Sequence, residues 1–240
     1  MTRRLLCLSL LLLVASFGFG QDAPAAPPKH HAHPAASQPA PSPDALWAEL
    51  MAGNRRFVAG KPRAYGLIAL RRKLASSQSP HVIILACSDS RVAPELVFDQ
   101  GLGDLFVVRT AGNVADPVAL GSIEYAVDHL HSTVLVVLGH QKCGAVAAAC
   151  SGEKMPSRNL DAIVDKINPA VAQAKTYAKG EGLLEAAIRE NVHQSARDVV
   201  ANSEIIGQAV KAGKLKVIEA EYEFDTGKVA RLEEPKTGHD

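Results

Sequence analysis

Cysteine and histidine occur in two short stretches of the chain whose residue types suit metal chemistry. Cys87 follows the apolar run Val82–Ala86, and His140 and Cys143 follow the apolar run Val134–Leu138. Thiolate sulfur and imidazole nitrogen are preferred zinc ligands, and a site with three protein ligands leaves the fourth position open for water or substrate. We therefore predict that Cys87, His140 and Cys143 hold one catalytic zinc ion (Zn2+) per subunit.

An acid and a base stand beside the first of these cysteines. Asp89 and Arg91 follow Cys87 closely in the chain. A carboxylate held by two nitrogens of a guanidinium stays ionised, so Asp89 could orient a nucleophile next to the metal. The alternative is an ordinary surface ion pair, worth at most about 1 kcal/mol. A cysteine after a buried strand is usually only a small apolar residue, but an acid and a base beside it favour a reactive site.

Three apolar runs would bring these residues together. Val82–Ala86, Leu105–Val108 and Val134–Leu138 are unbroken and rich in β-branched residues, which is typical of parallel strands buried on both faces. Ligands of open α/β sheets gather beyond the carboxyl ends of the strands. Two neighbouring strand ends would therefore bring the three metal ligands to one place. The alternating segment Leu215–Tyr222 predicts an edge strand.

Helical patterns fill the remaining parts of the chain. We predict helices from Asp44 to Gly53, from Asp116 through Leu130, and from Gly182 to Ile206, because cap residues and apolar spacing agree there. The first helix has one apolar stripe, formed by Leu46, Trp47, Leu50 and Met51. The predicted fold class is α/β, with a mostly parallel sheet, an antiparallel edge strand, flanking helices and an amino-terminal helical arm.

Composition limits both the number of domains and the classes of partner. The chain has 240 residues, of which 47% are hydrophobic, enough for one full-sized domain. We assign this domain to residues 44–240, with a flexible tail over about the last 10–15 residues. Lys and Arg number 26 against 25 Asp and Glu, so no strong field attracts nucleic acid or an anionic membrane.

The amino-terminal 43 residues divide into two segments. Residues 1–20 have a basic start and an apolar stretch before small residues, which predicts a cleaved signal peptide and export, to the periplasm of a double-membraned bacterium. An uncleaved anchor is the alternative, but a bilayer span needs about 20 apolar residues. Residues 21–43 are rich in Ala, Pro and His and predict a disordered linker. We expect no membrane contact after cleavage.

Longer motifs resemble a known family. Ala86–Val92 (ACSDSRV) and Gly139–Gly144 (GHQKCG) resemble the paired signature of the β-class carbonic anhydrases, and Gly53–Phe57 and Val108–Asn113 are similar to further family stretches. The resemblance extends from about Asp44 to Tyr222. It implies a zinc-dependent reversible hydration of carbon dioxide to bicarbonate and a proton, in which an Asp–Arg dyad orients a zinc-bound hydroxide.

The resemblance also implies roles for residues that the spacing alone would not single out. Gln78, Phe106, Ala111 and Tyr125 match residues that line the carbon dioxide pocket, partly across a dimer interface. Family members form homodimers through an amino-terminal helical arm, so we expect a homodimer or homotetramer whose arm buries the apolar stripe of the first helix on a neighbour. Members with an inhibitory bicarbonate pocket carry tryptophan and glycine where this chain has Ile84 and Ala86, so we expect no such pocket.

Several alternatives stay open at this level. The same fold and metal could hydrolyse carbonyl sulfide or carbon disulfide, or the zinc could stabilise a non-enzymatic binding module. A thiol oxidoreductase using Cys87 and Cys143 as a redox pair is disfavoured, because the Cys-x-x-Cys arrangement of such enzymes is absent. Proton transfer would suit a histidine, and the candidates are His81, His129 and His131. Cys150 is expected to be a buried helix thiol.

Overall fold

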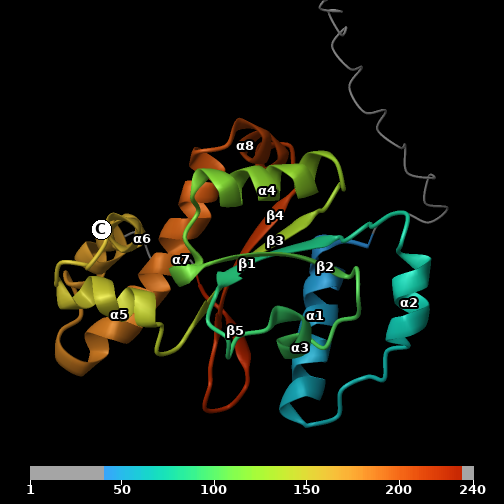
Figure 1. The fold of residues 1–240 in the computed structure, drawn as a ribbon, viewed down its shortest axis with the longest axis horizontal. Helices are drawn as coiled ribbons and strands as arrows, with labels where there is room; N and C mark the ends of the chain where they lie inside the picture. The colour runs from blue at the N-terminus through green and yellow to red at the C-terminus, as the bar shows by residue number, and fades with distance from the viewer. Residues whose placement is uncertain (1–40, 234–240) are drawn as a thin grey trace, which may run out of the picture. The chain divides into compact units, whose positions relative to one another are not determined.

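The sheet has the predicted mixed topology. The computed structural model describes residues 41–233, and five strands there form one sheet of order β2-β1-β3-β4-β5 (Figure 1). Its strands are β1 (Val82–Cys87), β2 (Leu105–Thr110), β3 (Val134–His140), β4 (Lys216–Tyr222) and β5 (Val229–Arg231). The pairs β1–β2, β1–β3 and β3–β4 are parallel, and β5 pairs antiparallel with β4. The predicted α/β class with an antiparallel edge strand is confirmed.

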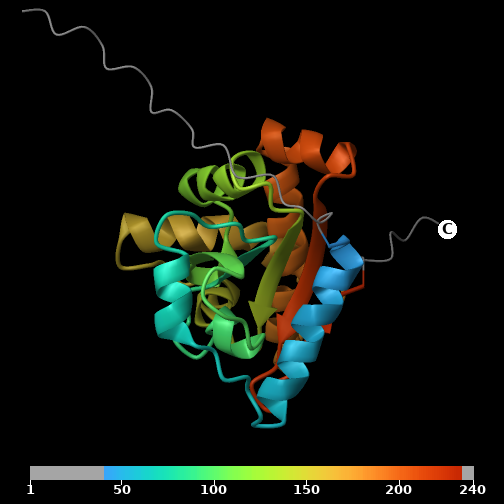
Figure 2. The same ribbon diagram turned by 90° about the vertical axis from the view of Figure 1, so that its right-hand side faces the viewer.

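Helices cover both faces of this sheet. The helices of the described residues are α1 (Pro43–Val58), α2 (Leu67–Lys73), α3 (Pro94–Val97), α4 (Pro117–Asp128), α5 (Gly144–Ser151), α6 (Arg158–Ala174), α7 (Leu183–Ala201) and α8 (Glu204–Lys211), with short 3-10 turns η1 (Ala111–Asn113) and η2 (Gly180–Gly182), and five of them, α1, α3, α4, α7 and α8, pack on the faces of the sheet. Side chains alternate along a strand. Ile83 and Leu85 therefore pack with α4, α7 and α8, whereas Ile84 and Ala86 pack on the opposite face with α1 and α3 (Figures 1 and 2).

The first helix differs from its prediction in length and in what it packs against. Ser42 caps α1, accepting a hydrogen bond from Ala45 N at 3.2 Å, and the helix continues past Gly53. Gly53 does not end the helix but permits close contact, since a Cβ there would lie 1.7 Å from the Phe98 carbonyl oxygen. Leu50 is buried in the chain's own core, so the prediction that a neighbour buries it is wrong.

The rest of the apolar stripe of α1 is covered in the same way. Three of its members are partly buried against the same core cluster, namely Leu46, Trp47 and Met51. Figure 2 shows α1 running alongside the sheet. Within one chain α1 is therefore an integral layer of the fold rather than a projecting arm.

Other boundaries also needed correction. The long helix predicted up to Ile206 is two helices, because Ser203 caps α8 by accepting a hydrogen bond from Ile206 N. Strand β4, predicted at an edge, lies between β3 and β5. β2 is an edge strand and is only partly covered, rather than buried on both faces. β5 occupies part of the stretch predicted as a flexible tail.

The predicted signal peptide and most of the predicted linker, residues 1–40, lie outside the described residues, as does the end of the tail, residues 234–240. Within residues 41–233 no helix is both long enough and apolar enough to span a bilayer. The sheet and its two helical layers position two strand ends, those of β1 and β3, at the same edge.

Candidate metal centre

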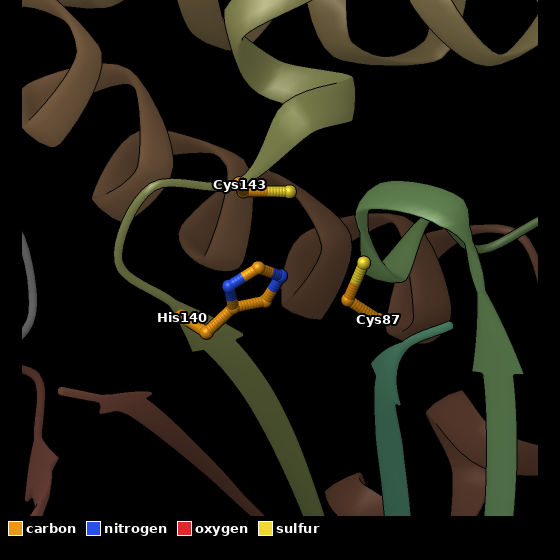
Figure 3. Close-up of side chains that lie close together, drawn as sticks. All are labelled: Cys87, His140 and Cys143. Carbon is orange, nitrogen blue, oxygen red and sulfur yellow. The ribbon is translucent and has the colours of Figure 1, made fainter. Parts of the chain in front are cut away.

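Three side chains converge where β1 and β3 end. Cys87 is the last residue of β1, His140 the last residue of β3, and Cys143 the cap of α5. One ligand atom from each lies within 4.8 Å of the others, and all three residues are buried (Figure 3). Because β1 and β3 are parallel neighbours, with Ala86 paired to Leu138, their carboxyl ends reach the same edge. The predicted convergence is confirmed, and metal binding itself stays a prediction.

The imidazole of His140 has one nitrogen engaged and one free. Nδ1 lies 2.8 Å from the backbone carbonyl oxygen of Gln141, which favours the tautomer with its proton on Nδ1. Nε2 is buried and has no hydrogen-bond partner. A buried polar atom without a partner calls for an explanation. A metal ion between Nε2 and the two sulfurs would satisfy it, so the donor set fits zinc.

Two backbone features shape the loop between β3 and α5. Gly139 allows close packing, since a Cβ there would lie 2.4 Å from Val192 Cγ2 of α7. Lys142 has a φ of +54°, in the left-handed region, which lets the chain turn back within three residues of His140. The turn brings Cys143 next to the imidazole.

The two sulfur atoms influence each other strongly. A hydrogen bond from the Cys143 side chain lowers the pKa of Cys87 to about 4, assisted by His140 and by the N–H of Gly112, which donates to Cys87 Sγ at 3.3 Å. The neighbouring Cys87 sulfur and burial raise the pKa of Cys143. Without a metal ion, the two cysteines therefore favour a state with one thiolate and one thiol. A divalent cation would stabilise both thiolates.

The predicted acid–base pair is formed beside this cluster. Arg91 Nε and Nη2 donate to the two carboxylate oxygens of Asp89 at 3.0 and 2.7 Å, and Arg91 N donates to Oδ1 at 2.9 Å. These bonds from Arg91 lower the pKa of Asp89 to about 2. Asp89 Oδ2 lies 4.0 Å from His140 Nε2. An ionised carboxylate therefore faces the free nitrogen of the cluster.

Comparisons with known proteins agree with this geometry. The sequence profile described as "Carbonic anhydrase" matches residues 82–229. The chain belongs to the β-carbonic anhydrase family. It is 40% identical over 194 residues to carbonic anhydrase 2 of Mycobacterium tuberculosis, covering 79% of this chain and 93% of that one.

Solved structures of the family share the fold. The β-carbonic anhydrase CcaA has a TM-score of 0.63 and 26% identity, over 78% of this chain and 95% of that chain. The β-carbonic anhydrase of Coccomyxa, in complex with acetazolamide, has a TM-score of 0.61 and 28% identity, over 80% of this chain and 84% of that chain.

Only one of the four residues that the family resemblance assigns to the carbon dioxide pocket lies beside the cluster. Ala111 directly precedes Gly112, whose N–H contacts Cys87. Phe106 pairs in register with Ile83, so it lies about 13 Å along the strand from the cysteine. The Phe106 and Tyr125 rings lie 6.3 Å apart.

Phe106 lines a different hollow. This hollow has a volume of about 330 Å³, runs along β2 and the start of α4, and includes Arg109 and Val118. Gln78 is exposed before β1 begins, at the far end of that strand from Cys87. Within one chain, Gln78, Phe106 and Tyr125 therefore lie away from the cluster, and their role in a pocket formed partly across a dimer interface stays a prediction.

The proposed proton carriers lie at the wrong end of the sheet. His81 precedes β1, and His129 and His131 precede β3, whereas the cluster follows the carboxyl ends of both strands. A strand of six residues spans about 20 Å. Within one chain, none of the three can pass a proton directly to the cluster.

The structure also describes three other residues of the sequence predictions, Cys150, Ile84 and Ala86. Cys150 is in α5 and only partly buried, and burial raises its pKa. Ile84 and Ala86 are fully buried within β1. The absence of an inhibitory bicarbonate pocket stays a prediction.

Sequence reasoning missed two residues that hold the dyad in place. Arg109 donates to the backbone carbonyl of Cys87 at 3.0 Å and to that of Asp89 at 2.6 Å, so it fixes the turn that carries both. The Phe224 ring lies 4.2 Å from the Arg91 guanidinium carbon and 5.3 Å from the His140 ring. A charged residue in an apolar strand was the available signal for Arg109, whereas nothing in the pattern around Phe224 pointed to the site.

Proposed function

We propose that this family member catalyses the reversible hydration of carbon dioxide to bicarbonate and a proton, with zinc held by Cys87, His140 and Cys143. One observation carries the proposal: a buried donor set with an unpartnered His140 Nε2 lies beside an ionised carboxylate, 4.0 Å away. The donor set suits zinc with one position left open. A bound zinc ion would act as a Lewis acid that makes water a nucleophile near neutral pH.

Asp89 would orient this nucleophile. Arg91 occupies both carboxylate oxygens with charge-assisted hydrogen bonds, which keeps Asp89 ionised and fixes its direction. An ionised carboxylate can only accept hydrogen bonds. Asp89 would therefore accept one from the attacking water, which directs a lone pair of the water oxygen toward carbon dioxide. Arg109 supports this role through the Asp89 carbonyl.

The surroundings of the sulfurs would exclude bulk water. An apolar cluster surrounds Cys87 and Cys143 and includes Val114, Val146 and Ile167. Carbon dioxide is small and apolar, so such walls accept it, and Ala111 stands beside them. The low dielectric also strengthens the charge interactions within the site.

The assembly of the enzyme belongs to the same proposal. Gln78, Phe106 and Tyr125 lie too far from the cluster of their own chain, so a pocket role requires a neighbouring chain. We therefore propose a homodimer, or a homotetramer built from dimers. Cleavage of residues 1–20 and export to the periplasm are also proposed, and the amino-terminal sequence of the protein recovered from a periplasmic fraction would test both.

Metal analysis combined with stopped-flow assays tests the proposal. The wild type is expected to hold one zinc per chain and to hydrate carbon dioxide, and His140→Ala is expected to lose both. An active protein free of zinc would overturn the assignment. Parallel assays with carbonyl sulfide and carbon disulfide separate the hydratase from a hydrolase of the same fold. Zinc without activity toward any of these substrates would instead support the binding module.

A further inference from the structure

The sulfur of Cys87 receives a hydrogen bond from a turn that another part of the chain holds in place. The turn is η1, and its Gly112 N–H donates to Cys87 Sγ at 3.3 Å. Gly112 has a φ of +71°, and a Cβ there would lie 2.7 Å from Ile167 Cδ1. Only glycine fits this position without strain. The conformation of η1 therefore decides whether the N–H points at the sulfur.

Two side chains of helix α7 contact η1. Asn191 Nδ2 donates to the Gly112 carbonyl oxygen at 2.8 Å, and Asn191 is 1% exposed. One helical turn later, Asn113 Nδ2 lies 3.5 Å from Ser195 Oγ, in an equally buried contact. Residues four apart lie on one face of a helix. Two buried contacts from one face thus fix two successive residues of η1.

The same helix also braces the strand that carries the imidazole. Val192 and Ile188 of α7 pack against Gly139, directly before His140. A shift of α7 would therefore disturb both sides of the metal centre. The contact through Asn191 differs from this packing, because it acts on the single peptide turn that faces the Cys87 sulfur.

We propose that Asn191 is a positioning residue for the metal centre: by holding the Gly112 carbonyl, it keeps the Gly112 N–H directed at the Cys87 sulfur. The proposal rests on the metal site of the proposed function. A hydrogen bond to a ligating sulfur stabilises its negative charge and orients it toward the metal. Loss of such outer contacts typically weakens metal binding by about 10–100-fold.

The test measures zinc release to a chromogenic chelator, together with the absorption of the cobalt-substituted protein. Asn191→Asp keeps the shape but places a carboxylate against the Gly112 carbonyl, which pushes η1 away. Zinc release is expected to become about tenfold faster or more. The sulfur-to-cobalt charge-transfer band is expected to move to lower energy, because the thiolate loses its hydrogen bond. Asn191→Ala serves as a second variant, with a smaller expected effect in the same direction.

Val199→Ala is the matched control. Val199 is a fully buried residue of α7 that packs in the cluster with α4 and α8, away from η1. The Val199→Ala substitution removes apolar packing from α7 without changing a contact of η1. Zinc release from this variant is therefore expected within twofold of wild type, with an unshifted cobalt band. Equal acceleration by Val199→Ala, or wild-type release by folded Asn191 variants, would overturn the proposal.

Ser195→Ala covers the case in which neither Asn191 variant folds. It removes only the 3.5 Å contact with Asn113 and is expected to release zinc at least twofold faster than Val199→Ala. An unchanged rate would count against the proposal. Neither readout depends on carbon dioxide turnover, so a protein that holds zinc tightly without hydrating carbon dioxide would refute the proposed function alone.

Discussion

Asp89 combines a partly buried position with an unusually acidic side chain. Three hydrogen bonds from Arg91 lower its pKa to about 2, so the carboxylate is ionised at every pH at which the protein would work. Any acid limb in the activity near neutral pH must therefore come from another group. The contribution of this pair to stability is present above the pKa of the unfolded carboxyl and is lost as the pH falls toward 2.

Asp89→Asn tests whether this charge is catalytic. The amide keeps the size of the side chain but removes the negative charge that orients the nucleophile, so kcat/KM for carbon dioxide hydration is expected to fall about 100-fold or more. Zinc content, measured by elemental analysis, is expected to stay unchanged. The control is Asp225→Asn, whose carboxylate pairs with Lys142 at 3.1 Å on the exposed rim. Equal activity of the two variants would show that Asp89 and Arg91 form only a surface ion pair.

The sequence predicted the site residues that lie at the ends of strands. It did not predict the site residues that come from distant parts of the chain. Cys87, His140 and Cys143 were predictable because strand ends fix their position. Asn191 and Phe224 were not, because their contacts depend on how α7 and the segment after β4 pack against the site. Such contacts join residues about 80 positions apart, and no local pattern records them.

Helix α1 is held against the sheet by close contact and by one buried amide. Asn54 Nδ2 donates to the carbonyls of Val97 and Gly227, at 3.1 and 2.9 Å, and Asn54 Oδ1 accepts from Val229 N at 3.0 Å. Next to it, the backbone at Gly53 touches the Phe98 carbonyl. The family stretch around these two residues thus joins α1 to the segment after α3 and to β5.

Gly53→Ala is expected to break this junction. The added Cβ would overlap the Phe98 carbonyl oxygen, which lies in rigid backbone, so the free energy of unfolding is expected to fall by about 2 kcal/mol or more. Gly121→Ala is the control, because Gly121 lies in α4 with nothing within 4 Å of a Cβ. That change is expected to be neutral or to stabilise by up to about 1 kcal/mol. Denaturant unfolding measures both, and equal stabilities would refute the packing argument.

Strand β4 and α7 enclose an acidic side chain. Glu221 is 4% exposed, and Arg189 Nε lies 3.1 Å from its Oε2, while Oε1 has no partner. Burial and the nearby Glu185 raise the pKa of Glu221 to about 7, against the opposing charge of Arg189. The folded chain therefore binds a proton between pH 4.5 and 7 that the unfolded chain has lost. Stability is expected to decline as the pH rises through this window.

Glu221→Gln is expected to remove this decline. The neutral amide has no charge to bury, so the variant is expected to gain on the order of 1–2 kcal/mol over wild type at pH 8 and little or nothing at pH 5. Urea unfolding at the two pH values provides the measurement. Glu153→Gln, an exposed change after α5, is the control. A gain of the same size at both pH values would contradict the assigned ionisation.

The buried strands were predicted to within two residues, whereas helices and edges were predicted less well. β1 and β3 are continuous apolar runs, which leave little choice of structure. Helix α6 went unpredicted, and it contains Pro169, a residue that normally interrupts a helix. β4 was taken for an edge because β5 is only three residues long, too short to show a pattern.

Across the described part of the molecule, one edge of the sheet has no partner strand. β2 is an edge strand whose outer backbone groups have no strand partner in the described chain, and α4 beside it exposes apolar side chains. Val118 is 79% exposed and Tyr125 46%. An open edge with apolar neighbours is a common site of pairing between chains. The sequence predicted the α/β domain, but it also predicted the dimer contact on α1. An apolar stripe in a sequence does not reveal whether its own chain or a neighbouring chain buries it.

Val118→Glu therefore tests the proposed homodimer. A charge at this position would have to be desolvated in an interface that includes the β2 edge, so size-exclusion chromatography with light scattering is expected to show a dimer or tetramer for wild type and a smaller species for the variant. Leu160→Glu is the control, since Leu160 is 43% exposed on α6, away from β2 (Figure 1). A wild type that runs as a monomer would refute the dimer, and a Val118→Glu protein of unchanged mass would move the interface elsewhere. Because Phe106 and Tyr125 lie beside this edge, loss of the dimer is also expected to lower hydration activity while zinc stays bound.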